Sequence, residues 1–88
     1  MTNKSRLIYH IEGIVQGVGF RPFVYTIALR YDLNGFVLNN SKGVLIEIEG
    51  FKESLDAFEK ALFKELPPLA RIDFWTKENL SLFSIPRE

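Results

Sequence analysis

A short glycine-rich segment carries the residue types best suited to chemistry in this sequence. It reads, in order, Gln16-Gly17-Val18-Gly19-Phe20-Arg21. The residues after it have helical spacing, so the segment is expected to lead into a helix N-terminus. Successive backbone N–H groups in such a turn, together with the positive end of the helix dipole, form a concave site for an anion.

Two well-known phosphate loops do not fit this segment. A P-loop requires Lys and then Ser or Thr after its last glycine, whereas Phe20 and Arg21 follow Gly19 here. A dinucleotide-binding fingerprint requires a third glycine, and Pro22 occupies that place. Any anion site in this segment is therefore of another kind.

Arg21 is the most informative residue of the segment. A cation in the first turn of a helix opposes the helix dipole and costs about 0.3 to 1 kcal/mol unless an anion lies beside it. Its planar guanidinium suits bidentate binding of a phosphate. A solvated arginine beside an ordinary tight turn explains the same residues, and both interpretations stay open at this point.

The elements that would position these residues follow one another without a linker or repeat. Period-two alternation predicts strands, helical spacing predicts two helices, and Asn34-Gly35 and Pro67-Pro68 are expected to end those helices. The expected strands cover 7–15, 35–39, 43–49 and 71–77, with a possible fifth short strand at 80–85, and the expected helices cover 21–31 and about 52–66.

This order predicts an α+β fold, the ferredoxin-like βαββαβ sandwich with two helices on one face of an antiparallel sheet. A right-handed crossover makes the first two strands parallel, so their C-terminal ends lie at the same edge of the sheet. Asn39 ends the second strand and is therefore expected beside the glycine-rich segment. Its carboxamide could hold and orient a water, whereas Asn40 is better explained as a turn residue.

Composition excludes several classes of function. Eleven basic and eleven acidic residues leave no charge excess for nucleic-acid phosphates. The chain has no Cys and one His, so a metal site or thiol chemistry is not expected, and no cofactor is predicted. It has neither a membrane-length apolar run nor a signal-peptide pattern at its N-terminus, which predicts a cytoplasmic protein that does not bind membranes.

Other polar or aromatic residues are assigned no catalytic role. His10, Glu12 and Glu47 fall on the expected polar face of the sheet, where solvated side chains are the ordinary case. RNA-recognition motifs share this element order but need exposed aromatics on the two central strands. Leu45, Glu47 and Glu49 do not provide them.

Two separated motifs resemble the signature of the acylphosphatase family. They are Gly13-Ile14-Val15-Gln16-Gly17-Val18-Gly19-Phe20-Arg21, and Gly35-Phe36-Val37-Leu38-Asn39 followed by Gly43-Val44. The resemblance implies hydrolysis of acyl phosphates to a carboxylate or carbamate and phosphate. It implies that Arg21 and Asn39 are catalytic, with Asn39 positioning the attacking water. It also implies that the phosphoryl group is bound by Arg21 and the backbone amides of Gln16, Gly17, Val18, Gly19 and Phe20.

A narrower resemblance concerns Arg21-Pro22-Phe23-Val24-Tyr25 and Pro67-Pro68-Leu69-Ala70-Arg71-Ile72-Asp73. These runs are similar to the N-terminal domain of the carbamoyltransferases of nickel-iron hydrogenase maturation, the HypF family. The resemblance implies that residues 1–88 are a single acylphosphatase-like domain at the N-terminal part of a longer protein. It implies carbamoyl phosphate as the substrate and a hydrogenase maturation protein as the partner.

Two alternatives stand beside that function. The chain could be a free-standing acylphosphatase, or a non-catalytic module that binds phosphate or docks a partner. Loss of phosphate release in the variants Arg21→Ala and Asn39→Ala would distinguish a hydrolase from such a module.

Overall fold

The computed structural model describes residues 4–80 of the 88-residue chain. Within these residues, four strands and two helices follow one another in the order β1, α1, β2, β3, α2, β4. Their bounds are Lys4–Ile14 for β1, Phe20–Arg30 for α1, Asn34–Asn39 for β2, Gly43–Phe51 for β3, Lys52–Lys64 for α2 and Arg71–Asn79 for β4. This is the expected ferredoxin-like α+β arrangement.

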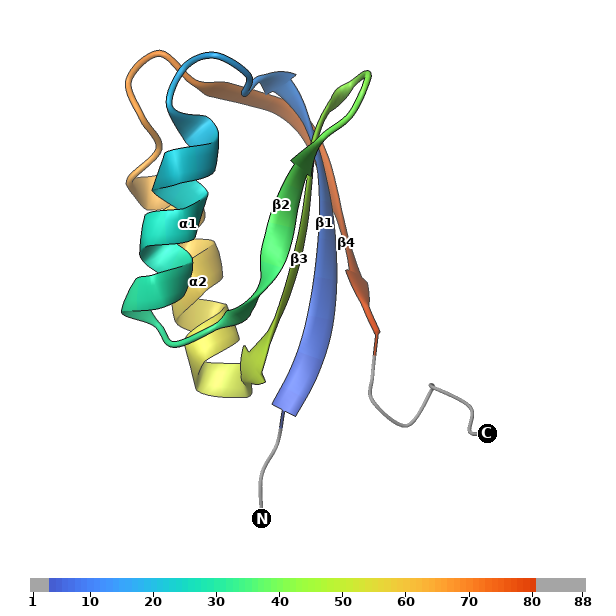
Figure 1. The fold of residues 1–88 in the computed structure, drawn as a ribbon, viewed down its shortest axis with the longest axis vertical. Helices are drawn as coiled ribbons and strands as arrows, with labels where there is room; N and C mark the ends of the chain where they lie inside the picture. Colours follow the sequence, from blue (N-terminus) through green and yellow to red (C-terminus); the bar gives the residue numbers. More distant parts are fainter. Residues whose placement is uncertain (1–3, 81–88) are drawn as a thin grey trace.

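The sheet has the strand order β2-β3-β1-β4, and every adjacent pair is antiparallel. Since β3 pairs with both β1 and β2, those two strands run in the same direction with β3 between them. The connection from β1 to α1 and the β2–β3 hairpin consequently lie at the same end of the sheet, at the top of Figure 1. This placement was expected from the crossover rule.

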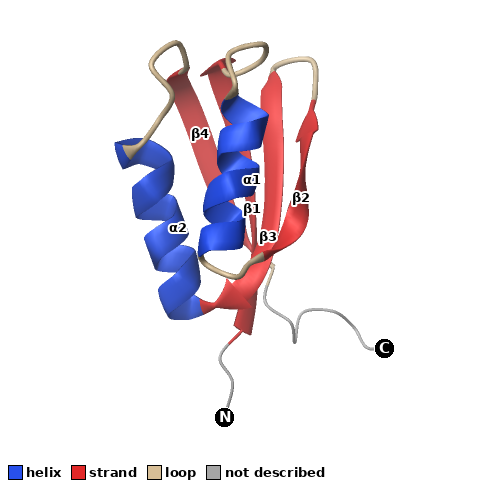
Figure 2. Cartoon of the chain, turned by 60° about the vertical axis from the view of Figure 1, so that its left-hand side comes forward, coloured by secondary structure: helices blue, strands red, loops and turns tan. Residues whose placement is uncertain are grey.

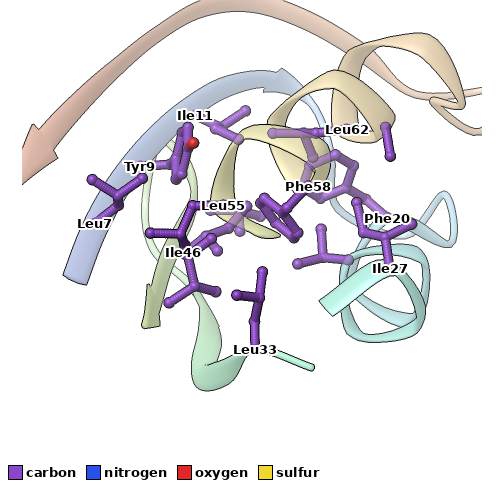
Figure 3. Packing of buried hydrophobic residues seen from close by; sticks show 14 of the residues in the cluster. Leu7, Tyr9, Ile11, Phe20, Ile27, Leu33, Ile46, Leu55, Phe58 and Leu62 are labelled. Atoms are coloured by element: carbon purple, nitrogen blue, oxygen red, sulfur yellow. The ribbon is translucent and has the colours of Figure 1, made fainter. Parts of the chain in front are cut away.

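The two helices cover one face of the sheet (Figure 2). Between them and the sheet lies a core of apolar side chains, in which Tyr9, Ile46 and Phe58 have no exposed surface (Figure 3). Alternate residues of β1 and β3 point into this core, which is the period-two pattern of their sequences. Among residues 4–80 no helix is long and apolar enough to cross a membrane.

The expected stop signal of the first helix, Asn34-Gly35, is wrong, although the expected range 21–31 differs from the observed one by only one residue at each end. Helix α1 ends at Arg30, and Asp32 adopts the left-handed conformation with φ of 60°. The backbone N–H of Leu33 then donates to the carbonyl of Ala28 and closes the turn. Asp tolerates this conformation better than most residues, so the chain turns before Asn34 and Gly35, which instead begin β2.

Other boundaries also differ by a few residues: β1 begins at Lys4, before the expected residue 7, and β3 ends at Phe51, after the expected residue 49. Helix α2 ends at Lys64, so Leu66 follows the helix and is half-buried. Strand β4 continues to Asn79, where it pairs with Leu7, and the N–H of Leu80 donates to the carbonyl of Arg6. The possible fifth strand at 80–85 falls, except for Leu80, outside the described residues.

Candidate active site

Residues 16–19 of the glycine-rich segment form a loop between two buried side chains. Val15 after β1 and Phe20 at the start of α1 each expose 1% of their surface. Between them, Gly17 and Gly19 have φ of 72° and 80°, in the left-handed region that favours glycine. An added Cβ would meet no atom within 4 Å at either glycine. The backbone conformation, rather than crowding, therefore requires glycine here.

The loop leads into the first turn of α1, which has no side-chain cap. Gly19 is the N-cap residue and offers no side-chain acceptor, and the first turn contains no acidic residue. The first helical hydrogen bond runs from the N–H of Phe23 to the carbonyl of Gly19. The N–H groups ahead of Phe23 have no acceptor within the helix, which together with the dipole makes this end of α1 suitable for an anion.

Arg21 differs from the other arginines within residues 4–80. Arg6 pairs with Glu47 and Glu49, Arg30 pairs with Glu65, and Arg71 pairs with Asp73. In this part of the chain no carboxylate pairs with Arg21, whose side chain is exposed in the first turn of α1. Its charge is thus placed where it opposes the helix dipole, and an anionic ligand would reverse the sign of that interaction.

Asn39 is the last residue of β2 and is exposed. It lies opposite Val44 of β3, which is fully buried under the helices. Residues directly opposite each other on antiparallel strands share a face of the sheet. Asn39 therefore lies on the helix-covered face, the same side as α1 and Arg21.

One contact joins the loop to the β2–β3 turn. The Gln16 side-chain amide donates hydrogen bonds to the carbonyl oxygens of Asn40 at 2.9 Å and Gly43 at 2.7 Å. The structure thus brings the loop against the residue that follows Asn39. The sequence analysis considered only the backbone amide of Gln16, because nothing in the local sequence indicates a contact 24 residues away.

The site contains no arrangement suited to a resident metal. Within residues 4–80 no group of three or more His, Cys, Asp or Glu residues comes close enough to hold an ion. The candidate site contains the backbone N–H groups at the start of α1, the guanidinium of Arg21 and the carboxamide of Asn39. These groups can bind a tetrahedral oxyanion and orient a water beside it.

The sequence profile that matches the chain decides its family. The profile is described as Acylphosphatase, and it matches residues 7–82, which include both the loop and the β2–β3 hairpin. The chain belongs to the acylphosphatase family.

Relatives of this acylphosphatase domain are of two sizes. An acylphosphatase from Mannheimia succiniciproducens is 43% identical over 74 residues, which cover 83% of this chain and 78% of that protein. The carbamoyltransferase HypF from Rhizobium leguminosarum bv. viciae is 56% identical over 68 residues, which cover 77% of this chain. The acylphosphatase domain spans only 9% of that relative's length.

A solved structure confirms the fold of the acylphosphatase domain. The crystal structure of a full-length HypF in a phosphate- and nucleotide-bound form matches it with a TM-score of 0.88 and 40% sequence identity. The match covers 93% of this chain and 11% of that one. The same fold therefore occurs in this domain and within a much longer protein.

Proposed function

We propose that this domain hydrolyses acyl phosphates, producing a carboxylate or carbamate and inorganic phosphate. One observation carries the proposal. The loop before α1 is hydrogen-bonded to the turn that follows Asn39, and it leads into an uncapped first helical turn that contains Arg21. The family membership of the chain supports the same chemistry. Neither a thiol nor a metal is required by this arrangement.

In the proposed mechanism, the backbone amides of residues 16–20 and the guanidinium of Arg21 bind the phosphoryl oxygens. The carboxamide of Asn39 holds a water in line with the bond that breaks. The water oxygen forms a bond to phosphorus while the bond between phosphorus and the acyl oxygen breaks. The departing carboxylate keeps the electron pair, and a phosphate oxygen accepts the proton of the water.

This mechanism needs no titrating side chain. A carboxylate is a weak base and therefore a good leaving group, so no general acid has to protonate it. The negative charge of the phosphoryl group is instead neutralised by donors that are already in place, which is the largest catalytic contribution in many enzymes. Arg21 and the loop would mainly bind and stabilise charge, and Asn39 would mainly orient the nucleophile.

We further propose carbamoyl phosphate as the substrate. Support comes from the relatives named carbamoyltransferase HypF, of which one is 56% identical over most of this chain. In this proposal residues 1–88 are one domain, the N-terminal part of a longer cytoplasmic carbamoyltransferase. The released carbamate is then used in nickel-iron hydrogenase maturation, with a maturation protein as the partner.

Phosphate release by the purified chain tests this function. We expect hydrolysis of carbamoyl phosphate and of acetyl phosphate, and a loss of about 100-fold or more in kcat/KM for Arg21→Ala and Asn39→Ala. Matched controls exist on the same two elements: Arg30→Ala at the other end of α1 and Asn34→Ala at the other end of β2. Both controls are expected to keep full activity.

The two variants should also differ from each other. Arg21→Ala should weaken binding of inorganic phosphate, whereas Asn39→Ala should lower kcat and leave that affinity unchanged. If the unmodified chain binds phosphate but releases none from either substrate, it is a phosphate-binding module and not a hydrolase. Faster turnover of acetyl phosphate than of carbamoyl phosphate would contradict the proposed substrate alone.

A further inference from the structure

The side chain of Gln16 makes a bridge that its backbone role does not explain. Its Nε2 atom lies 2.9 Å from the carbonyl oxygen of Asn40 and 2.7 Å from that of Gly43. A side-chain amide has two N–H donors, so both can be used at once. The two acceptors flank the same turn: Asn40 follows β2, and Gly43 is the first residue of β3.

That turn has its own internal hydrogen bonds. The side-chain oxygen of Asn40 accepts from the N–H groups of Lys42 and Gly43, both at 2.9 Å, and the N–H of Asn40 donates to the carbonyl of Gly43 at 2.9 Å. Asn40 therefore fixes the shape of the turn, as asparagine often does. Gln16 binds to a preformed pair of carbonyl oxygens rather than to a loose loop.

The bond to Asn40 also connects the ends of two strands that are not neighbours. Strand β3 separates β1 from β2, so the ladder hydrogen bonds of the sheet do not join the end of β1 directly to the end of β2. Across residues 4–80, the two bonds of Gln16 are those that connect the loop to the turn. Both sides of this connection flank candidate catalytic groups: the loop precedes Arg21, and the turn follows Asn39.

We propose that Gln16 is a positioning residue for hydrolysis, which holds the turn at a fixed distance from the phosphate loop. It binds no substrate with its side chain. It keeps Asn39, and the water that Asn39 orients, aligned with a phosphoryl group bound by the loop. The proposal rests on the function proposed above, and it adds that the two halves of the site depend on this one side chain for their alignment.

Kinetics of Gln16→Met test this role. Methionine has nearly the same length but no donor, and the backbone amide at this position is kept. We expect kcat to fall about tenfold to 100-fold, the range that a misplacement of about 1 Å can cause. The dissociation constant of inorganic phosphate should change by less than about threefold, because the loop and Arg21 remain. Ser41→Ala, in the same turn but outside the bridge, is the control and should retain kcat.

A double-mutant cycle separates action through the turn from action elsewhere. Asn40→Ala removes the acceptor that shapes the turn. If Gln16 acts through this turn, the effects of Gln16→Met and Asn40→Ala on kcat will be far from additive. Additive effects, an unchanged kcat in Gln16→Met, or a loss of phosphate affinity as large as the loss of kcat would each overturn the proposal.

Amide hydrogen exchange tests the bridge without any turnover. Inorganic phosphate bound at the loop should slow the exchange of the Lys42 and Gly43 amides in the unmodified chain but not in Gln16→Met. Equal slowing in both proteins would overturn the role of Gln16. If the unmodified chain binds phosphate and shows this difference but hydrolyses nothing, the proposed hydrolysis fails while the bridge is upheld.

Discussion

The connection from β1 to α1 shows how differently the core and the candidate site are built, because its two ends are buried and the residues between them are mostly exposed. Val15 and Phe20 are buried to 99% of their surface in a core where no polar or charged residue of the described chain is buried. Between them lie the left-handed Gly17 and Gly19, and the uncapped first turn of α1 that follows contains the exposed Arg21. The core contributes stability through burial, whereas the first turn of α1 holds the charge of Arg21 where it is unfavourable without an anion. Core substitutions should therefore lower stability and leave the activity per folded molecule unchanged, whereas substitutions in the loop and at Arg21 should lower activity.

The largest effect on stability is expected in the core. Phe58 of α2 has no exposed surface and packs against Tyr9 with ring centroids 6.1 Å apart. Phe58→Ala should lower the free energy of unfolding by about 3 to 5 kcal/mol, measured by urea denaturation. Activity per folded molecule should not change. Phe63→Ala removes a phenylalanine of the same helix that is 38% exposed, and it should have a smaller effect. Equal losses in the two variants would contradict the division between core and surface.

A smaller loss of stability is expected at Gly19, which lies between the exposed loop and the buried Phe20. Gly19→Ala places a Cβ on a residue with φ of 80°, which costs about 1 to 2 kcal/mol. No atom lies within 4 Å of that Cβ, so no cost from crowding is added. Activity should fall as well, because the same backbone forms the proposed phosphate loop. Urea denaturation and phosphate release measure the two effects, and a variant with wild-type values for both would show that the left-handed turn is dispensable.

Arg21→Ala is expected to change the free energy of unfolding by a still smaller amount, and in the opposite direction. Removing a cation from the first turn of α1 relieves its repulsion with the helix dipole, so Arg21→Ala should raise the free energy of unfolding by about 0.3 to 1 kcal/mol in phosphate-free buffer. Activity should be lost in the same variant. Adding phosphate should stabilise the unmodified chain and not the variant. A destabilised variant would show that Arg21 has a structural role in the isolated domain.

The smallest effect concerns the pH dependence of stability. Burial raises the pKa of Glu59, but hydrogen bonds from Lys77 and Tyr9 outweigh it and hold that pKa below 4.5. A pKa lowered by folding gives stability that is present above pH 4.5 and is lost as the pH falls through the lower value. Glu59→Gln should flatten this acid limb in urea denaturation curves, and Lys77→Met should weaken it. An unchanged slope in Glu59→Gln would contradict the assignment.

Much of the fold could be predicted from the sequence because the patterns are strong. Alternation in β1 and β3 and the apolar stripe of α2 match the buried residues of the structure. The residue that turns the chain after α1 could not be predicted, because Asp32 rather than Asn34-Gly35 takes the left-handed conformation. Asparagine followed by glycine is a strong local signal for the end of a helix. In the structure, however, both residues belong to β2 and pair with β3.

The site was predictable only in part. The glycine-rich turn, Arg21 and Asn39 are visible as residue types at the ends of predicted elements, and the crossover rule places them at one end of the sheet. The bridge from Gln16 to the turn was not predictable, because it depends on a three-dimensional distance between residues 24 and 27 positions apart. Its backbone acceptors leave no trace in the sequence.

The most direct test of the central claim is hydrolysis of carbamoyl phosphate by the purified chain in ¹⁸O-labelled water. Attack of the water at phosphorus places one labelled oxygen in the released phosphate, which mass spectrometry detects. We predict labelled phosphate above a protein-free blank, with the excess absent in Arg21→Ala and Asn39→Ala. Unlabelled phosphate, or no release above the blank, would contradict the proposal that the loop and Asn39 direct a water to phosphorus.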